Sequence, residues 1–485
     1  MAEPILACRD LTFRYDGEPV FEHLSLSVEP GEAVLLMGPS GCGKSSLAYC
    51  LSGLYPAYGG ELSGEITLEG RPLAQYEIAD RAQAVSILFQ NPDNQFCMDR
   101  VDHEILFALE NINYPGDLRG RMRQLLALVG LEAVETALIH TLSGGTKQKL
   151  ALATALATGA KVLILDEPFA NLDPGACAQL SEQLRQLNRQ GLTLLVVDHR
   201  PDYWRPFLTR VLMMNRDGSL EPGCLLPDEL EAHRAEFEAR GLFLDDQWLE
   251  RRHPLPLPQP ETAAVEGEDV SLVYGRKAVV KGLSFRFPKG GVTALVGRNG
   301  SGKTSLLTAI AGAGGYKGRL RVEGPVGLVF QNPRFQFLSL SVEEEVLTTL
   351  RAAKPKADPK ELSAQAEALL EEFGLLPWRK HSPYALSQGQ QRRLALLAML
   401  AGEQPLLLLD EPTYAQDQRA TAFILDLLER RVAEGLTAVI ATHDLTLAKR
   451  CANVIYLLED GRMERLTPED LDRYAQERGC VPCGS

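Results

Sequence analysis

The stretch EAVLLMGPSGCGKSSLAYCL at residues 32–51 places an apolar segment before a glycine-rich turn, and the turn opens a second apolar segment. This order of buried strand, glycine loop and helix is the context that a phosphate-binding loop requires. Glycines let backbone N–H groups approach phosphate oxygens, and the helix N-terminus adds partial positive charge. The stretch therefore predicts an α/β nucleotide-binding fold, in which Lys44 reaches the terminal phosphates and Ser45 binds Mg²⁺.

The same loop occurs twice in the chain. The stretch GVTALVGRNGSGKTSLL at residues 291–307 gives the same tasks to Lys303 and Thr304. Other motifs recur in the same order and at closely matched spacing, which identifies an internal duplication. The recurring motifs are FQNPDNQF (89–96) with FQNPRFQF (330–337), LSGGTKQK (142–149) with LSQGQQRR (386–393), and VLILDEP (162–168) with LLLLDEP (406–412).

A proline-rich segment separates the two copies. Alternating prolines between residues 254 and 260 fix the backbone and favour an extended, semi-rigid linker. We therefore expect a first domain at 1–250, a linker at 251–262 and a second domain at 263–485. The second copy is about 18 residues shorter between its phosphate loop and its FQNP motif. The missing part matches LAQYEIADRAQ (73–83), so we expect the second domain to lack a short helix.

Composition limits the class of protein. The chain has 485 residues, 45% of them hydrophobic, and a net charge of -14. No apolar run reaches the roughly 18 residues of a bilayer-spanning helix, and no secretory signal is recognised. The acidic balance disfavours a protein whose main task is binding nucleic acid. Nine scattered cysteines indicate reduced thiols, and Cys480 with Cys483 supply only half of a zinc site.

Acidic residues end two predicted buried strands. The continuous apolar runs of VLILDEP and LLLLDEP are typical of strands covered on both faces of a mostly parallel sheet. Ligands bind beyond the carboxyl ends of such strands, so Asp166 and Asp410 are candidates to hold Mg²⁺ or its waters. Glu167 and Glu411, one residue further on, are candidates to orient or deprotonate an attacking water. LSGGTKQKLALATALA (142–157) predicts a serine-capped helix whose N-terminus is an anion site.

With these motifs in place, the chain resembles the ATP-binding cassette (ABC) ATPases over nearly its whole length. The resemblance implies two tandem P-loop NTPase domains, each with a mostly parallel sheet core, an antiparallel subdomain and a helical signature subdomain. His199 and His443 are similar to the family's switch histidines, and Gln90 and Gln331 to a glutamine that contacts Mg²⁺ and water. The implied ATP contacts are Tyr15, Gly38, Ser40, Gly41, Gly43, Lys44, Ser45, Ser46, Ser143, Gly144 and Gly145 in the first half, and Tyr274, Gly297, Asn299, Gly300, Gly302, Lys303, Thr304, Ser305, Ser387, Gln388 and Gly389 in the second.

In this family two cassettes close head to tail, so each ATP lies between one phosphate loop and the other cassette's signature. The resemblance implies that this chain is its own dimer. The sequence departs from the pattern at Gln388, which replaces a signature glycine, and at Thr146, which replaces a glutamine. It also departs at Gln416, which replaces the leucine found at the matching position of the first copy, Leu172. These departures put equal turnover of the two sites in doubt. Because both glutamates and both histidines are present, we expect both sites to hydrolyse ATP.

The loop NPDNQF is similar to a pattern of energy-coupling factor (ECF) transporters, which import vitamins and other micronutrients. In that branch the segment lies beside the groove that receives the transmembrane T component, and a separate S component selects the substrate. We therefore expect the chain to lie on the cytoplasmic face of the cell membrane, bound through these partners and not to nucleic acid. The expected partner interface consists of Pro92, Asp93, Gln95, Phe96, Pro333, Gln336 and Phe337, with the two phenylalanines exposed.

Three alternatives remain open at this point. A fused ATPase of a sugar importer has a similar length, but its two halves usually differ in catalytic competence. An exporter would normally carry or recruit transmembrane domains. A ribosome-associated ABC translation factor would have a long, basic, helical connector, whereas this chain has a short proline-rich one.

Overall fold

The computed structural model describes residues 3–15, 17–169, 172, 174–242, 244–258, 262–274, 277–298, 300–413 and 418–477. These residues divide between Asp245 and Asp246 into two compact units, which are described separately here. Among the described residues, no helix is long and apolar enough to cross a membrane.

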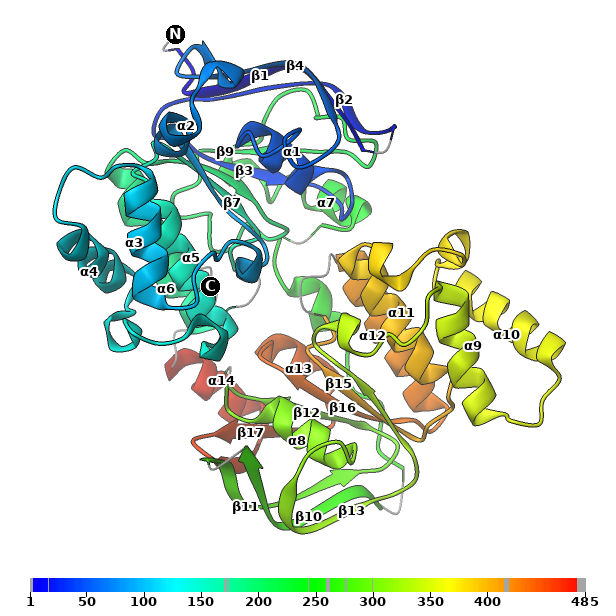
Figure 1. The fold of residues 1–485 in the computed structure, drawn as a ribbon. Coiled ribbons are helices and arrows are strands. Elements are labelled where there is room, and N and C mark those ends of the chain that lie inside the picture. The colour runs from blue at the N-terminus through cyan, green and yellow to red at the C-terminus, as the bar shows by residue number, and fades with distance from the viewer. Residues whose placement is uncertain are drawn as a thin grey trace. The chain divides into compact units, whose positions relative to one another are not determined.

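The first unit contains an antiparallel and a parallel sheet (Figure 1). The antiparallel sheet has the order β2-β1-β4-β5, and the parallel sheet has the order β6-β7-β8-β3-β9. The strands are β1 Leu6–Tyr15, β2 Glu18–Val28, β3 Ala33–Met37, β4 Glu61–Leu68, β5 Arg71–Pro72, β6 Val85–Leu88, β7 Val162–Asp166, β8 Thr193–Val197 and β9 Arg210–Met213. The helices are α1 Lys44–Leu51, α2 Ile78–Ala84, α3 Val101–Asn111, α4 Leu118–Val129, α5 Gly144–Ala157, α6 Pro174–Arg189 and α7 Arg234–Arg240.

The second unit repeats this plan. Its antiparallel sheet has the order β11-β10-β13, and its larger sheet the order β14-β15-β16-β12-β17-β18, in which β18 pairs antiparallel with β17. The strands are β10 Ala263–Tyr274, β11 Lys277–Pro288, β12 Val292–Val296, β13 Tyr316–Val322, β14 Val326–Val329, β15 Leu406–Asp410, β16 Thr437–Thr442, β17 Val454–Glu459 and β18 Arg462–Leu466. The helices are α8 Lys303–Ile310, α9 Val342–Ala353, α10 Pro359–Glu372, α11 Gln388–Leu400, α12 Gln418–Ala433, α13 Leu445–Cys451 and α14 Pro468–Glu477.

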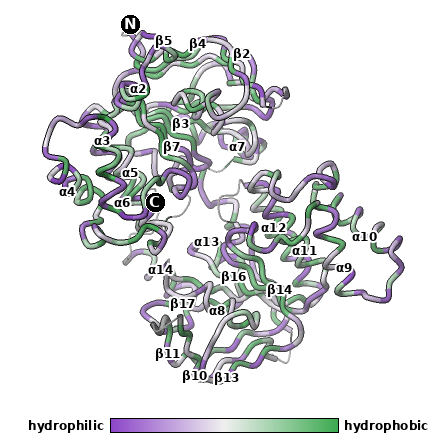
Figure 2. The backbone as a smooth tube through the Cα atoms, viewed as in Figure 1, coloured by the Kyte–Doolittle hydropathy of each residue, from purple (hydrophilic) through white to green (hydrophobic). Residues whose placement is uncertain are grey.

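The predicted apolar runs form the centres of the parallel sheets. Every residue of β3, β7 and β8 is buried, as is every residue of β12, β15 and β16. Figure 2 shows the hydrophobic residues concentrated along these strands and the helices against them. The predicted fold class, α/β with a parallel core, an antiparallel subdomain and a helical subdomain, is confirmed in each unit.

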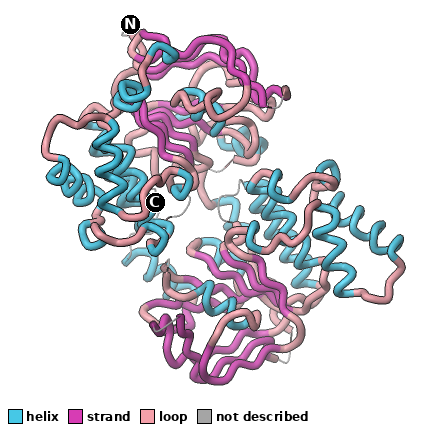
Figure 3. The backbone as a smooth tube through the Cα atoms, in the orientation of Figure 1, coloured by secondary structure: helices cyan, strands magenta, loops and turns pink. Residues whose placement is uncertain are grey.

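The helical subdomain lies to one side of the strands in each unit (Figure 3), and its helices α5 and α11 contact β6 and β14. In the first unit α3, α4 and α5 contact one another, and in the second α9 contacts α10 and α11. The α2 helix has no counterpart in the second unit, because β13 ends at Val322 and β14 begins at Val326. The predicted loss of a short helix is therefore confirmed.

The proline-rich segment predicted as a linker lies against the second unit. Leu249 is buried in that unit's core, and Arg252 forms an ion pair with Asp426. The side-chain amide of Asn453 donates a hydrogen bond to the carbonyl of Leu255 at 2.6 Å. Residues 246–258 therefore belong to the second unit by their contacts, whereas the sequence placed the first domain's end near 250.

Candidate functional site

Strand order assembles the candidate site of each unit at one edge of its parallel sheet. In the first unit the neighbours β6, β7, β8 and β3 run parallel, so their carboxyl ends lie side by side. Gln90 follows β6, Glu167 follows β7, His199 follows β8, and the glycine loop follows β3. The second unit repeats this order with β14, β15, β16 and β12. The topology therefore brings together residues that lie more than a hundred positions apart.

Two matched pairs of glycines in the two loops have similar φ angles. Gly41 and Gly43 have φ values of 81° and 101°, and Gly300 and Gly302 have values of 82° and 107°. These left-handed conformations favour glycine, and they turn the chain into the N-termini of α1 and α8. A Cβ atom on Gly38 would lie 2.5 Å from the carbonyl oxygen of Met214, so the loop also requires its first glycine.

The loop lysines are buried under the loops. Lys44 Nζ donates hydrogen bonds to the carbonyl oxygens of Gly38 at 2.8 Å and of Pro39 at 2.9 Å. Lys303 Nζ contacts the carbonyl of Gly297 at 2.6 Å in the same way. Each ammonium group is thus held against a loop whose backbone N–H groups can bind an anion.

A hydroxyl and a carboxylate meet beside each loop. Ser45 donates a hydrogen bond to Asp166 Oδ1 at 2.9 Å, and Thr304 donates one to Asp410 Oδ2 at 2.7 Å. Burial, reinforced by the charge of Glu167, raises the pKa of Asp166 to about 7, and burial also raises the pKa of Asp410.

These oxygen groups fit a hard divalent cation. Asp166 Oδ2 is buried with no donor in hydrogen-bonding geometry among the described residues. A desolvated carboxylate paired with a hydroxyl is a donor set that Mg²⁺ accepts. When bound there, Mg²⁺ would neutralise phosphate charge.

Glu167 is held at the end of β7 by three contacts. Its backbone has φ 46°, and its N–H donates to the carbonyl of Val197 at 2.8 Å. His199 Nε2 lies 2.7 Å from one carboxylate oxygen, and the side-chain amide of Gln90 donates to the other. Burial by itself raises the pKa of Glu167, but the charge of His199 and its hydrogen bond outweigh burial and lower the pKa. The carboxylate is therefore kept ionised and able to accept a proton.

Glu411 is held differently at the same place in the second unit. His443 uses its other ring nitrogen, Nδ1, which lies 3.0 Å from Glu411 Oε1. The hydroxyl of Thr442 donates to Oε2 at 3.2 Å. Burial opposes the charge on both members of the pair, but their mutual attraction lowers the pKa of Glu411 and raises the pKa of His443.

Asp198 is a buried acid that the sequence analysis missed. Its Oδ1 accepts the N–H of His199 at 2.7 Å, and its Oδ2 accepts the indole N–H of Trp204 at 2.9 Å. Burial raises the pKa of Asp198 to about 6. Thr442 stands at the matching position of the second unit, so a comparison of the residue before each switch histidine could have found this difference.

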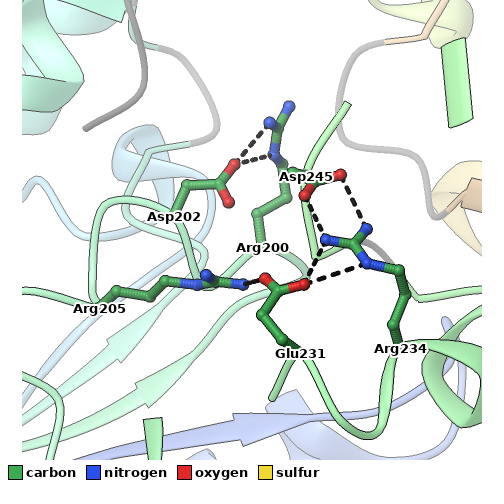
Figure 4. A network of polar contacts seen from close by, with 6 residues as sticks. All are labelled: Arg200, Asp202, Arg205, Glu231, Arg234 and Asp245. Atoms are coloured by element: carbon green, nitrogen blue, oxygen red, sulfur yellow. Dashed lines mark hydrogen bonds and ion pairs between the residues drawn. The ribbon is translucent and has the colours of Figure 1, made fainter. Parts of the chain in front are cut away.

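Ion pairs order the segment that follows His199 (Figure 4). Arg200 pairs with Asp202 at 2.6 Å. Glu231 accepts hydrogen bonds from Arg205 and Arg234, and Arg234 also pairs with Asp245 at the end of the unit. These contacts tie the last turns of the first unit to its switch segment.

Each signature motif caps a helix as predicted. The hydroxyl of Ser143 accepts the N–H of Thr146, and that of Ser387 accepts the N–H of Gln390, both at 3.3 Å. The side chain of Gln390 accepts a hydrogen bond from the backbone N–H of Ser387, which completes a capping box. In the first unit, the hydroxyl groups of Thr146 and Ser143 instead form a hydrogen bond 2.8 Å long. The replacement at Thr146 therefore preserves a local contact to the cap.

Two residues predicted to contact a partner also make hydrogen bonds inside their units. Gln95 accepts the N–H of Phe89 at 3.4 Å and donates to the carbonyl of Ala151 in α5 at 3.2 Å. Gln336 makes the same pair of contacts in the second unit, and its bond to α11 is 2.9 Å long. The repeated glutamine therefore links the FQNP loop to the signature helix.

The expectation that Phe96 and Phe337 are exposed is wrong. Phe337 is 6% exposed and packs edge-on against Tyr384, and Phe96 is half-buried against the core. Pro92 and Pro333, which open the short turns, are buried as well. In the loop of the second unit, Phe335 is exposed instead, at 78%.

Asp93 of the first unit and Arg334 of the second occupy the same position, and each contacts a residue of its own unit's signature helix. Asp93 pairs with Lys147 of α5 at 2.6 Å, whereas Arg334 donates to the side chain of Gln391 of α11 at 3.2 Å. Because the residue on the helix changes together with the residue on the loop, each unit keeps a polar link at this point.

Of the remaining predicted residues, some lie in the described part of the chain and others lie outside it. Tyr15 is half exposed at the end of β1, as a stacking residue must be. Asn299, Gln416, Cys480 and Cys483 lie outside the described residues, as do the side chains of Tyr274 and Gln388. The remaining predicted loop and signature residues are Ser40, Ser46, Gly144, Gly145, Ser305 and Gly389, which lie on the glycine loops or in the first turns of α1, α5, α8 and α11.

Comparison with known proteins places both halves in one family. The model of the ABC transporter family matches residues 21–170 and 280–414. The "Putative HMP/thiamine import ATP-binding protein YkoD" of Bacillus subtilis is 34% identical, over 99% of this chain and 94% of its own length. A "Putative ABC transporter ATP-binding protein" of Methanosarcina acetivorans is 32% identical over 93% of this chain. Among solved structures, an RNase-L Inhibitor matches with a TM-score of 0.64 at 20% identity, covering 96% of this chain and 93% of its own, which shows the fold alone.

Proposed function

Because the chain belongs to the ABC transporter family of ATP-binding proteins, which hydrolyse ATP, we propose that it energises a membrane importer of the ECF type. Two features support this branch. The chain is similar over almost its full length to a relative named for HMP/thiamine import. Its NPDNQF loop also resembles the ECF pattern.

The observation that carries the proposal is the presence of the same candidate catalytic groups in each unit. Both units have a buried loop lysine, a hydroxyl bonded to a strand-end aspartate, and a glutamate paired with a histidine. This argues against a sugar-importer ATPase in which one half has lost competence. Both units are therefore proposed to bind ATP with Mg²⁺ and to hydrolyse it.

In the proposed cycle, head-to-tail closure of the units forms two composite sites. One site pairs Lys44, Asp166 and Glu167 with Ser387 and Gly389 of the other unit. The second pairs Lys303, Asp410 and Glu411 with Ser143, Gly144 and Gly145. Glu167 and Glu411 orient and deprotonate the attacking water, and hydrolysis reopens the units.

The proposed partner surface is asymmetric. Phe335, Leu338 and Leu340 of the second unit, which lie in or directly after the FQNP loop, are 78%, 84% and 93% exposed. The matching positions of the first unit carry the less apolar residues Asn94, Cys97 and Asp99. Exposed apolar clusters favour protein interfaces. We assign the cluster to the T component, which would hold the chain at the cytoplasmic face of the membrane while an S component selects the substrate.

A detergent-solubilised pulldown of the tagged native chain tests this function. We expect a polytopic membrane protein with a small, very hydrophobic second protein. The triple variant F335S/L338S/L340S should lose both, whereas the matched first-unit variant N94S/C97S/D99S should retain them. Recovery of ribosomal proteins, or of two permease subunits with a soluble binding protein, would overturn the ECF assignment.

A further inference from the structure

A buried arginine connects the second signature helix to the second catalytic centre. Arg392 lies on α11, five positions after Ser387, and is 1% exposed. Its Nη2 donates a hydrogen bond to the carbonyl of Gln331 at 2.7 Å, and its Nη1 donates to the carbonyl of Glu411. One guanidinium therefore holds the backbone of the glutamine loop and of the proposed catalytic glutamate.

The backbone of Glu411 has an unfavourable conformation that hydrogen bonds to its neighbours stabilise. Glu411 has φ 50°, a left-handed conformation that is strained for a non-glycine residue and persists only when its surroundings hold it. Its N–H is fixed by the carbonyl of Ala441 at 2.8 Å. Arg392 fixes the other side of the same residue, so both backbone groups of Glu411 are bonded.

The first unit has no such arginine at this position. Gln148 takes the matching place on α5, five residues after Ser143, and is fully buried. Neither polar atom of its side chain has a hydrogen-bond partner among the described residues. Glu167 has nearly the same backbone conformation, with φ 46°, but its carboxylate is held from outside the helix by Gln90. The two centres are thus positioned by different contacts.

We propose that Arg392 is a positioning residue of the second catalytic centre, which couples the signature helix α11 to Glu411 and the glutamine loop. The inference rests on the proposed function, in which Ser387 at the start of α11 faces ATP bound by the first unit. Engagement of that helix would then be transmitted through Arg392 to the second glutamate. The first signature helix has only Gln148 at this point, so the coupling runs in one direction.

Arg392→Gln, which installs the first unit's residue, tests the proposal. In the Glu167→Gln background, where Glu411 supplies the turnover, we expect kcat to fall at least about tenfold while KM for ATP changes less than about twofold. Arg393→Gln is the matched control, because Arg393 has the same side chain one position along and bonds to the carbonyl of Phe373 in the helical subdomain. It should change kcat little. Arg392→Lys should restore part of the lost rate, since one ammonium cannot reproduce the guanidinium fork.

Hydrogen–deuterium exchange of the full chain supplies a second readout that does not depend on turnover. Arg392→Gln should accelerate exchange in residues 326–338 and 406–413, and Arg393→Gln should not. Equal kcat values for the two variants, or exchange that is unchanged at both segments, would overturn the proposal. Either result would leave the ATPase assignment intact, because that assignment fails only if the glutamates themselves prove dispensable.

Discussion

His199 Nε2 lies 2.7 Å from Oε1 of Glu167, and the attraction between the two side chains lowers the pKa of this buried carboxyl group. The corresponding pair in the second unit is joined through His443 Nδ1 at 3.0 Å. The two centres therefore share residue types but differ in the ring nitrogen that faces the carboxylate.

The first prediction concerns the pH dependence of hydrolysis. Attraction to His199 keeps the pKa of Glu167 low against the raising effect of burial. In His199→Ala the largest effect that opposes burial is removed and only those of Lys44 and Gln90 remain, so the pKa of Glu167 rises and its base form is lost at a higher pH. The acid limb of the kcat profile, measured in the Glu411→Gln background, should move to higher pH. An acid limb at the wild-type position would contradict this account of the pair.

The second prediction concerns stability. Asp198 has a pKa of about 6 in the folded chain, above its ordinary value of 3.8, so the folded state binds this proton more tightly than the unfolded state. Its contribution to the free energy of unfolding is therefore largest below pH 4 and is lost as pH rises to about 6. Asp198→Asn should flatten this part of the pH dependence in urea unfolding. Asp80→Asn, at an exposed helical position, should leave the slope unchanged.

The third prediction concerns the glutamine braces. Gln95→Leu removes an acceptor for the N–H of Phe89 and a donor to the carbonyl of Ala151, and should lower the free energy of unfolding by about 1 to 3 kcal/mol. Exposed Asn94→Ala is the control and should change it by less than about 0.5 kcal/mol. Thermal unfolding checks both variants. An unchanged free energy of unfolding in Gln95→Leu would contradict the bracing role and leave only the predicted partner contact for this glutamine.

Much of the fold follows from period and order in the sequence. The apolar runs ending in Asp166 and Asp410 predicted buried parallel strands, and the two glycine loops predicted the strand-to-helix turns. Those features are local, so one stretch is enough to specify them. The shorter connection in the second copy also predicted correctly that α2 has no counterpart there.

The direction in which each side chain points could not be predicted from the sequence in this way. Phe337 and Phe335 both follow Pro333 in a short turn, and only the folded backbone decides that Phe337 enters the core while Phe335 stays outside. Arg392 and Gln148 stand at matching positions, but their contacts depend on strands that are distant in the sequence. The sequence therefore predicted which residues lie near the candidate site. It did not predict which neighbours the side chain of each residue contacts.

The most direct measurement of the central claim is ATP hydrolysis by Glu167→Gln, Glu411→Gln and the double variant, with nucleotide binding measured in parallel. Each single variant should retain part of the turnover, and the double variant should bind ATP but release no phosphate above background. Glu238→Gln, at an exposed position of α7, is the control for a lost surface charge. Unchanged turnover in the double variant would contradict the account, because no catalytic role would then remain for either glutamate.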